Sequence, residues 1–238
     1  MAAPKAVTFD NFGTIIDWEG EIQKQFKKIL AKHGIVDADV KALQRHWENR
    51  QFDYIQEKYR PYKEVLRNTL PMAFNDFGYP FTEEDCIEFS ESMGKWQPFA
   101  DSREALLELK KYTKIVLITN TDDEIIKESV KQIGVEFDEI ITAEQAGAYK
   151  PSHKGFHLAL DRLGLDKSEV LHAGFGFKYD VVPATELGFK TCWINRQGEV
   201  RPVDVQETYL VGDMATFTLL IKAMAQTESI KWEKELVK

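Results

Sequence analysis

Residues 5–18 read KAVTFDNFGTIIDW, and this stretch decides the fold because a short strand pattern is followed at once by a carboxylate. The run Ala6–Phe9 is mostly apolar without strict alternation, which is typical of a strand covered on both faces. Asp10 stands at its end, and Phe12 follows where a second acid would suit acid–base chemistry. A single aspartate at a strand end is a weak signal, so its meaning depends on the rest of the chain.

Short apolar runs of strand length recur along the chain. They are Ile115–Ile118, Ile140–Thr142, Val170–Ala173, Thr191–Ile194 and Tyr209–Val211. Amphipathic stretches lie between them, for example SREALLELKKY, in which Ser102 suits an N-cap, and DDEIIKESVKQIG, which opens with acids and closes with Gly134. This alternation predicts an α/β fold with a Rossmann-like, doubly wound, mainly parallel sheet.

The segment that follows the first strand, roughly residues 19–95, has no strand pattern and contains several helical ones. One of them spaces its apolar residues by a helical period, namely Ile22, Phe26, Ile29 and Leu30. We therefore expect a core domain made of residues 1–17 plus 97–238 and an inserted helical domain made of residues 18–96.

Composition excludes several classes of function. The 238 residues include 31 Lys and Arg against 39 Asp and Glu, a formal net charge of −8, which argues against a broad nucleic-acid surface. The N-terminus lacks the apolar core of a signal peptide and no run approaches the ~18 apolar residues of a membrane span, so we expect a cytoplasmic protein without membrane contact. Cys86 and Cys192 have no CxxC spacing and are expected to be buried fillers.

Polar side chains follow the ends of the predicted strands. Asp10 follows the first strand, Thr119 and Asn120 the second, Lys150 the third and Asp180 the fourth. In an open parallel sheet, ligands gather outside the carboxyl ends of the strands. We therefore expect these side chains to form one site.

Each of these residues alone also has a purely structural explanation. Asp10 suits a turn before glycine, and Asp180 suits the cap of a following helix. Lys150 precedes Pro151, which is favoured at the first position of a helix, and would then be a solvated side chain. The joint pattern at four strand ends is what favours a functional site.

Four segments together resemble the ordered motifs of the haloacid dehalogenase superfamily, and most of all its type II 2-haloacid dehalogenases. They read FDNFGTIIDW, LITNTDD, GAYKPSHKGF and YDVVPATELGFKTCWINRQG. The resemblance extends over roughly residues 5–225 and includes a helical cap after the first motif. It implies the same α/β fold, with residues 18–96 as the cap domain.

The resemblance also gives Phe12 a meaning. Phosphatases of the superfamily carry a second aspartate at that position and a metal-binding acid after the glycine of the fourth motif, where this chain has Phe12 and Phe175. A halide ion is a weak base that leaves without protonation, and displacement at carbon needs no metal to neutralise phosphate charge. We expect a metal-free and cofactor-free displacement.

The mechanism implied by the resemblance is nucleophilic catalysis in two steps. Asp10 would attack the α-carbon of a small 2-haloacid, and water would hydrolyse the resulting ester at the Asp10 carbonyl carbon. Lys150 would keep Asp10 ionised, Thr14 and Thr119 would donate hydrogen bonds, and Asp180 would position or deprotonate the water. We expect six residues to line the substrate pocket, namely Phe12, Asn120, Arg45, Glu48, Phe175 and Phe177.

Three positions depart from the dehalogenase pattern. In WENRQFDY, Glu48 stands where the relatives carry an arginine, and Arg45, three residues earlier on the same helix face, would be the nearest substitute or a partner of Glu48. In GFGFKYD, Phe175 and Phe177 replace small polar residues, and Lys178 is the neighbouring cation. The third is residue 156, a phenylalanine where relatives often have tyrosine. All three changes remove polar groups from the expected pocket.

The sequence leaves three functions open. The first is a hydrolase that acts on the carbon–halogen bond of a halogenated carboxylic acid. The second is a repurposed or non-catalytic relative that binds a small ligand or partner, and the third is a Mg²⁺-dependent phosphatase. The aromatic residues of HWENRQFDYIQEKYRPYKEVL fit the seams of a helical bundle, a homodimer contact or the lining of the substrate entrance.

Overall fold

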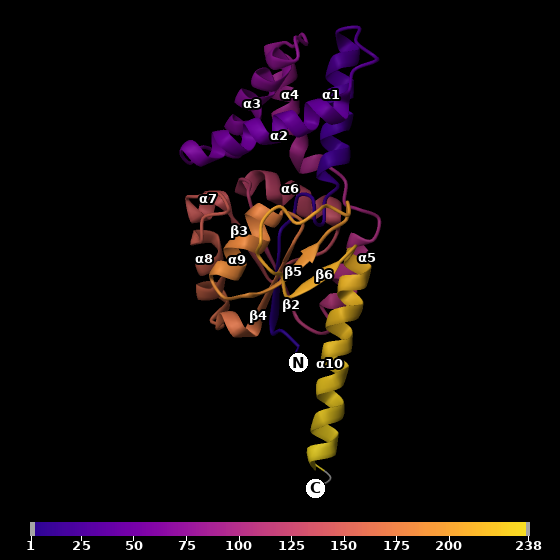
Figure 1. The fold of residues 1–238 in the computed structure, drawn as a ribbon, viewed down its shortest axis with the longest axis vertical. Coiled ribbons are helices and arrows are strands. Elements are labelled where there is room, and N and C mark those ends of the chain that lie inside the picture. Colours follow the sequence, from indigo (N-terminus) through magenta and orange to yellow (C-terminus); the bar gives the residue numbers. More distant parts are fainter. Residues whose placement is uncertain (1–2, 237–238) are drawn as a thin grey trace.

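A computed structural model describes residues 3–236 and shows a parallel sheet covered by helices (Figure 1). The strands are β1 (Ala6–Phe9), β2 (Lys114–Thr119), β3 (Glu139–Thr142), β4 (Val170–Gly174), β5 (Lys190–Ile194) and β6 (Tyr209–Val211). They are hydrogen-bonded in the order β3-β2-β1-β4-β5-β6, and all neighbours are parallel. The α/β class and the doubly wound, parallel sheet predicted from the sequence are confirmed.

The order of the strands places β1 in the middle of the sheet. The chain builds β2 and β3 on one side of β1 and then crosses to β4, β5 and β6 on the other. The strand order therefore reverses between β1 and β4, which is where open α/β sheets bind ligands. Within this pairing Phe9 lies opposite Leu117 of β2 and Ala173 of β4, so the carboxyl ends of the three strands are level.

Alternate residues of β1 serve the two faces of the sheet. Val7 and Phe9 belong to the larger apolar cluster, whereas Ala6 belongs to a second, smaller one. The larger cluster includes side chains of α5 (Ser102–Leu109), α6 (Asp123–Ile133) and α10 (Met214–Leu236). The smaller cluster includes side chains of α8 (Lys154–Leu163) and α9 (Val182–Glu186). Burial on both faces explains why these strands lack alternation in sequence.

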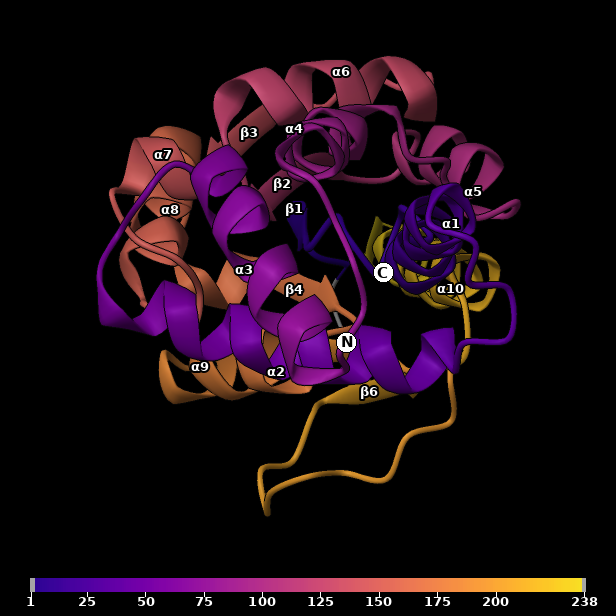
Figure 2. The same ribbon diagram turned by 90° about the horizontal axis from the view of Figure 1, so that it is seen from above.

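Four helices form a separate layer over the carboxyl ends of the strands (Figures 1 and 2). They are α1 (Trp18–Lys32), α2 (Val40–Glu57), α3 (Tyr62–Asp76) and α4 (Glu83–Ser92), and the short helix η1 (Met93–Lys95) follows them. Aromatic rings form the interior of this layer: Phe26 and Phe89 each pack edge-on against Trp47 and lie in tilted contact with each other. The Trp47 indole N–H donates to Thr69 Oγ1 at 3.0 Å, so this large side chain is buried without an unpaired polar atom.

Hydrogen bonds of Asp122 and Tyr149 join the helical layer to the part of the chain that contains the sheet. Asp122, just after β2, caps α3 by accepting from the backbone N–H of Tyr62 at 2.7 Å and of Lys63 at 3.1 Å. The Tyr149 hydroxyl donates to the carbonyl oxygen of Arg60 at 2.6 Å.

The division into two domains stays a prediction. Within residues 3–236, no helix has the length and apolar character needed to cross a bilayer.

The remaining short elements connect the main ones. They are α7 (Ala143–Ala146), the 3₁₀ helix η2 (Lys167–Glu169) and a single π-helical turn, η3 (Phe177–Val181). The π turn directly follows β4 and precedes α9, and π turns of this kind are frequent at functional sites. It carries Asp180 to the edge of the sheet where Asp10 lies.

Candidate active site

Asp10 lies at the carboxyl end of β1, and its neighbours fix the carboxylate in one orientation. The backbone N–H of Asp10 continues the ladder by donating to Ala173 O at 3.1 Å. The Thr14 hydroxyl donates to Asp10 Oδ2 at 2.8 Å and accepts from the backbone N–H of Phe175 at 2.8 Å. Thr14 therefore ties Asp10 to the loop that follows β4, as the sequence led us to expect of a hydroxyl donor.

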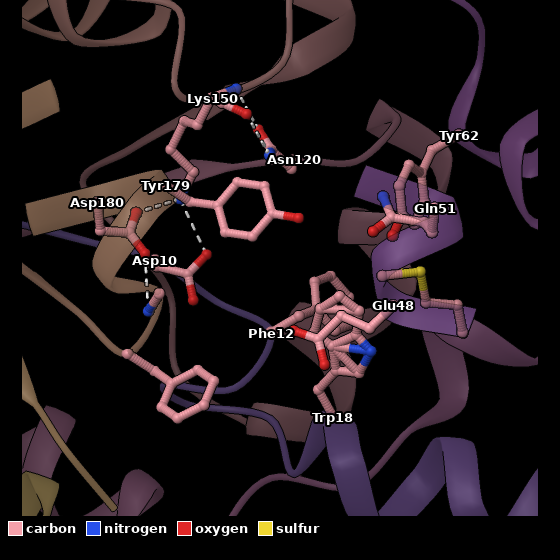
Figure 3. Close-up of a pocket in the computed structure, with 13 residues that line it drawn as sticks. Asp10, Phe12, Trp18, Glu48, Gln51, Tyr62, Asn120, Lys150, Tyr179 and Asp180 are labelled. Carbon is pink, nitrogen blue, oxygen red and sulfur yellow. Dashed lines mark hydrogen bonds and ion pairs between the residues drawn. The ribbon is translucent and has the colours of Figure 1, made fainter. Parts of the chain in front are cut away.

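Lys150 connects two carboxylates in the interior. Its ammonium nitrogen lies 2.9 Å from Asp10 Oδ1 and 2.6 Å from Asp180 Oδ1, and all three side chains are buried (Figure 3). Asn120 holds the backbone of Lys150, because its Oδ1 accepts from the Lys150 N–H at 2.7 Å and its Nδ2 donates to the Lys150 carbonyl at 3.1 Å. The four strand ends thus meet in one charged cluster.

A buried histidine and two glycines position Asp180. His172 Nε2 lies 3.2 Å from Asp180 Oδ1, and His172 Nδ1 lies 2.9 Å from Thr8 Oγ1, which fits a tautomer with its proton on Nε2. The Gly176 N–H donates to Asp180 Oδ2 at 3.2 Å. A Cβ at Gly174 would lie 2.6 Å from Asp180 Cγ, so only glycine allows this close approach.

Burial and neighbouring charges shift the pKa values of Asp10 and Asp180 in opposite directions. Burial, together with the charge of Asp180, raises the pKa of Asp10 from 3.8 to about 6 although Lys150 acts against it. Burial also opposes ionisation of Asp180, but the closer ammonium of Lys150 and the hydrogen bond from His172 hold the pKa of Asp180 below its usual value. Burial disfavours the ammonium of Lys150, yet Asp10 and Asp180 together raise its pKa. Lys150 is therefore a permanent cation beside Asp10.

A cavity of about 60 Å³ opens in front of Asp10, between the sheet and the helical layer. A single water needs about 10–15 Å³ on this measure, so the cavity has room for a molecule of a few heavy atoms. Its lining residues are Asp10, Phe12, Trp18, Glu48, Gln51, Tyr62, Met93, Asn120, Lys150, Phe175, Gly176, Tyr179 and Asp180. Phe12 packs edge-on against Trp96, with ring centroids 6.1 Å apart. The cavity is thus lined by aromatic side chains around a small group of charged ones.

Besides Thr14, which contacts Asp10, three predicted site residues lie outside this cavity. Arg45 is exposed in a separate surface groove with Lys41, because three positions along a helix also move a side chain about 4.5 Å along its axis. Thr119 is buried and its hydroxyl has no hydrogen-bond partner among the described residues. Phe177 packs against Trp193, with ring centroids 4.8 Å apart, and borders only an adjoining groove. None of these three side chains lines the cavity in this structure, and their roles toward a substrate stay predictions.

Glu48 does face the cavity. Its Oε2 accepts from Gln44 Nε2 at 3.1 Å, and no ion pair joins it to Arg45 in the part of the chain that is described. Burial, with the charges of Glu19 and Glu199, raises the pKa of Glu48 to about 7. Lys178, which borders the adjoining groove, acts in the opposite direction.

Sequence reasoning missed several residues of the site. The helical layer contributes Trp18, Gln51, Tyr62 and Met93 to the lining, and η3 contributes Tyr179. Their side chains read as ordinary core or surface positions in sequence, and only the docking of the helical layer brings them over Asp10. His172 was also missed, although a histidine inside a fully buried strand was a usable signal. Phe156, singled out as a departure from the family pattern, packs against His172 instead of lining the cavity, with ring centroids 4.9 Å apart.

The site offers little to a metal ion. No group of three or more His, Cys, Asp or Glu side chains suited to a metal occurs among the residues that the structure describes. Asp10 and Asp180 are both engaged by Lys150, and the neighbouring positions 12 and 175 carry phenyl rings without oxygen ligands. Magnesium prefers several oxygen ligands, which this set does not supply.

Comparison with known proteins adds independent information. The family model described as haloacid dehalogenase-like hydrolase matches residues 4–188. Haloacetate dehalogenase H-2 of Moraxella sp. (strain B) is 26% identical over 206 residues, covering 83% of this chain and 88% of that protein. A solved L-2-haloacid dehalogenase superposes with a TM-score of 0.84 at 21% identity, covering 93% of this chain and all of the other. The L-2-haloacid dehalogenase of Xanthobacter autotrophicus with chloropropionic acid covalently bound gives a TM-score of 0.81 at 19% identity, with 94% and 100% covered. At these identities the structural likenesses show the fold alone.

Proposed function

This chain belongs to the haloacid dehalogenase-like hydrolase family, and we propose that it hydrolyses the carbon–halogen bond of small 2-halogenated acids or their derivatives through an ester on Asp10. The observation that carries the proposal is the fixed carboxylate of Asp10, which lines a small aromatic cavity between a hydroxyl donor and a buried ammonium. The names of the relatives, a haloacetate dehalogenase and two L-2-haloacid dehalogenases, support the substrate class.

The first step is a displacement at carbon. An oxygen of Asp10 forms a bond to the halogen-bearing carbon while the carbon–halogen bond breaks and its electron pair leaves with the halide. No general acid is needed for so weak a base, which agrees with the phenyl ring of Phe12 at the cavity wall. Lys150 and Thr14 hold the carboxylate in place for the attack. Orientation of this kind lowers the barrier without any further chemistry.

The second step is hydrolysis of the ester. Water attacks the carbonyl carbon of Asp10, the bond between Asp10 and the substrate oxygen breaks, and one proton is released. Asp180 lies on the other side of Lys150. Among the residues that the structure describes, its Oδ2 accepts one hydrogen bond, from Gly176, so it has lone pairs left to orient the water. Because the pKa of Asp180 is held low, positioning suits it better than proton abstraction. Lys150 and Thr14 also stabilise the oxyanion of the tetrahedral intermediate.

The helical layer completes the site. We propose that residues 18–96 act as a cap domain that excludes water from the ester until the halide has left, since Trp18 and Tyr62 of this layer close the cavity above Asp10. The phenyl rings of Phe12 and Phe175, in place of oxygen ligands, support a reaction without metal. A cytoplasmic location and a homodimer contact stay predictions.

The test is halide release from chloroacetate, bromoacetate, fluoroacetate, both enantiomers of 2-chloropropionate and the corresponding amides, each with excess EDTA. We expect release that survives EDTA and is lost in Asp10→Asn, while the surface variant Asp166→Asn, matched in chemistry, keeps it. A single turnover in heavy-oxygen water should place the label on Asp10, because hydrolysis occurs at its carbonyl carbon.

Three outcomes would contradict the proposal. Halide release that persists in Asp10→Asn would assign the reaction to another group. Magnesium-dependent release of phosphate from a generic phosphate ester, without any halide release, would favour the phosphatase alternative, and the absence of any turnover would favour a binding protein.

A further inference from the structure

The charges that line the cavity are mostly negative. The lining includes the carboxyl groups of Asp10, Glu48 and Asp180 and one cationic side chain, that of Lys150. Both Asp10 and Asp180 already bind the Lys150 ammonium, at 2.9 and 2.6 Å. Among the residues that the structure describes as lining the cavity, there is therefore no cation left for a negatively charged group of the substrate.

The wall opposite Asp10 presents hydrogen-bond acceptors. Glu48 and Gln51, three positions apart on α2, both reach the cavity from the helical layer, and Figure 3 shows them across the cavity from Asp10. Residues three apart on a helix lie on neighbouring parts of one face. Glu48 Oε2 is bound by Gln44, which leaves the second oxygen of this carboxyl group for another donor.

Gln51 is an independent sign that the cavity binds a polar group. Its side chain is only 2% exposed and lines the cavity, yet its Oε1 has no hydrogen-bond partner among the described residues. Buried polar atoms without a partner are rare, and each one calls for an explanation such as a bound ligand. A side-chain amide one helical turn from a carboxyl group is suited to a polar, uncharged group of the substrate, and the carboxyl group of Glu48 favours one with an N–H or O–H donor.

We propose that the cavity selects 2-halogenated amides over 2-haloacids, with the amide NH₂ donating to Glu48 and Gln51 and the halogen-bearing carbon facing Asp10. This inference rests on the proposed function and names its substrate class. A carboxylate in the same place would face Glu48 with a like charge, whereas an amide NH₂ donates to Glu48. Gln51 can pair with either group, because its side-chain amide both donates and accepts. The raised pKa of Glu48, about 7, means that above neutral pH this repulsion is fully present.

A 2-haloamide would react by the same two steps as a 2-haloacid. An Asp10 oxygen bonds to carbon 2 as the halide leaves with the electron pair of the carbon–halogen bond. Water then attacks the Asp10 carbonyl carbon, the 2-hydroxyamide departs, and one proton goes to solvent. The amide group itself is not cleaved.

The experiment compares 2-chloropropionamide with 2-chloropropionate, two molecules of nearly equal shape, by kcat/KM for halide release at pH 8. The wild type should prefer the amide by about 100-fold or more, because a buried site built for a donor rejects an analogue that lacks it and adds a like charge. Glu48→Gln removes the charge and should reduce this preference to less than about 10-fold. Glu57→Gln, on the same helix but exposed and paired with Arg60, should leave the preference unchanged.

A binding measurement separates this inference from the proposed function. Competition or thermal-shift titration with propionamide and propionate, which carry no halogen, should show tighter binding of the amide in the wild type and a smaller difference in Glu48→Gln. Tighter binding or faster turnover of the acid would overturn the preference for amides and leave dehalogenation standing. Absence of halide release from both substrates would overturn the proposed function, while the binding comparison would still decide which group the cavity accepts.

Discussion

Asp10→Asn should stabilise the fold at pH 8 while it abolishes turnover. Burial raises the pKa of Asp10 from 3.8 to about 6, a value that already includes the attraction of Lys150. The native state therefore binds the Asp10 proton more tightly than the unfolded chain does. The stability associated with this group is fully present below pH 3.8 and is lost as the pH rises through about 6.

The size of the effect follows from the two pKa values. Since one pH unit corresponds to about 1.36 kcal/mol, ionisation of Asp10 costs about 3 kcal/mol of unfolding free energy at pH 8 and about 1 kcal/mol at pH 4.5. Asparagine has the same shape and no charge, and its carbonyl oxygen still accepts from Lys150. The variant should therefore gain about 3 kcal/mol at pH 8, and this gain should shrink by about 2 kcal/mol at pH 4.5.

The assay is urea unfolding followed by tryptophan fluorescence at both pH values, with Asp180→Asn as the matched control. The pKa of Asp180 is held low because the ammonium of Lys150 and the hydrogen bond from His172 outweigh its burial, so its ionised form stabilises the native state. This contribution is present above the unfolded pKa and is lost as the pH falls, and Asp180→Asn should therefore destabilise the protein at pH 8. Equal losses in the two variants at pH 8 would refute the assignment of opposite electrostatic roles.

Other predictions concern activity and the junction of the two layers. The kcat/KM for halide release should rise about tenfold per pH unit below about 6 and level off above it, because only ionised Asp10 attacks; a flat profile between pH 5 and 8 would contradict this. Phe12→Asp should lower halide release at pH 7 at least about tenfold and move the rise to higher pH, since a second carboxylate raises the pKa of Asp10, whereas Phe12→Leu should keep the profile. Asp122→Ala should cost about 1–2 kcal/mol in urea unfolding and raise KM, because Asp122 caps α3 from the sheet side. Asp39→Ala, which removes the cap of α2 within the helical layer, should show a loss of similar size with KM unchanged.

The sequence predicted the charged residues at the sheet side of the site, because parallel strands place their carboxyl ends at the same edge of a sheet. Each apolar run predicted a strand, and the polar residue after it was therefore expected at the carboxyl edge of the sheet. Asp10, Lys150 and Asp180 are far apart in the chain, yet they meet within hydrogen-bond distance because β3, β2, β1 and β4, in this order, lie side by side in the sheet. Their catalytic roles stay predictions until the variants are measured.

The part of the cavity that the helical layer lines was much less predictable from the sequence. Helical periodicity placed Arg45 and Glu48 on one face of a helix, but the position of a residue over the sheet depends on how the helical layer docks. For this reason Glu48 and Gln51 reach the cavity while Arg45 lies in a separate groove. Thr119 shows the same limit on the sheet side, because a residue at a strand end can point to either face and its hydroxyl does not line the cavity.

The placement of Glu48 and Gln51 on one helix has a consequence for how new specificities arise. The groups that we propose to take part in bond breaking and formation come from residues before 18 and after 96, whereas Glu48 and Gln51 come from the single segment Val40–Glu57. Replacement of a few codons in that segment can exchange the preferred substrate while Asp10 and Lys150 stay untouched. A mutant library confined to α2 is therefore the place to search for variants that prefer another halogenated compound.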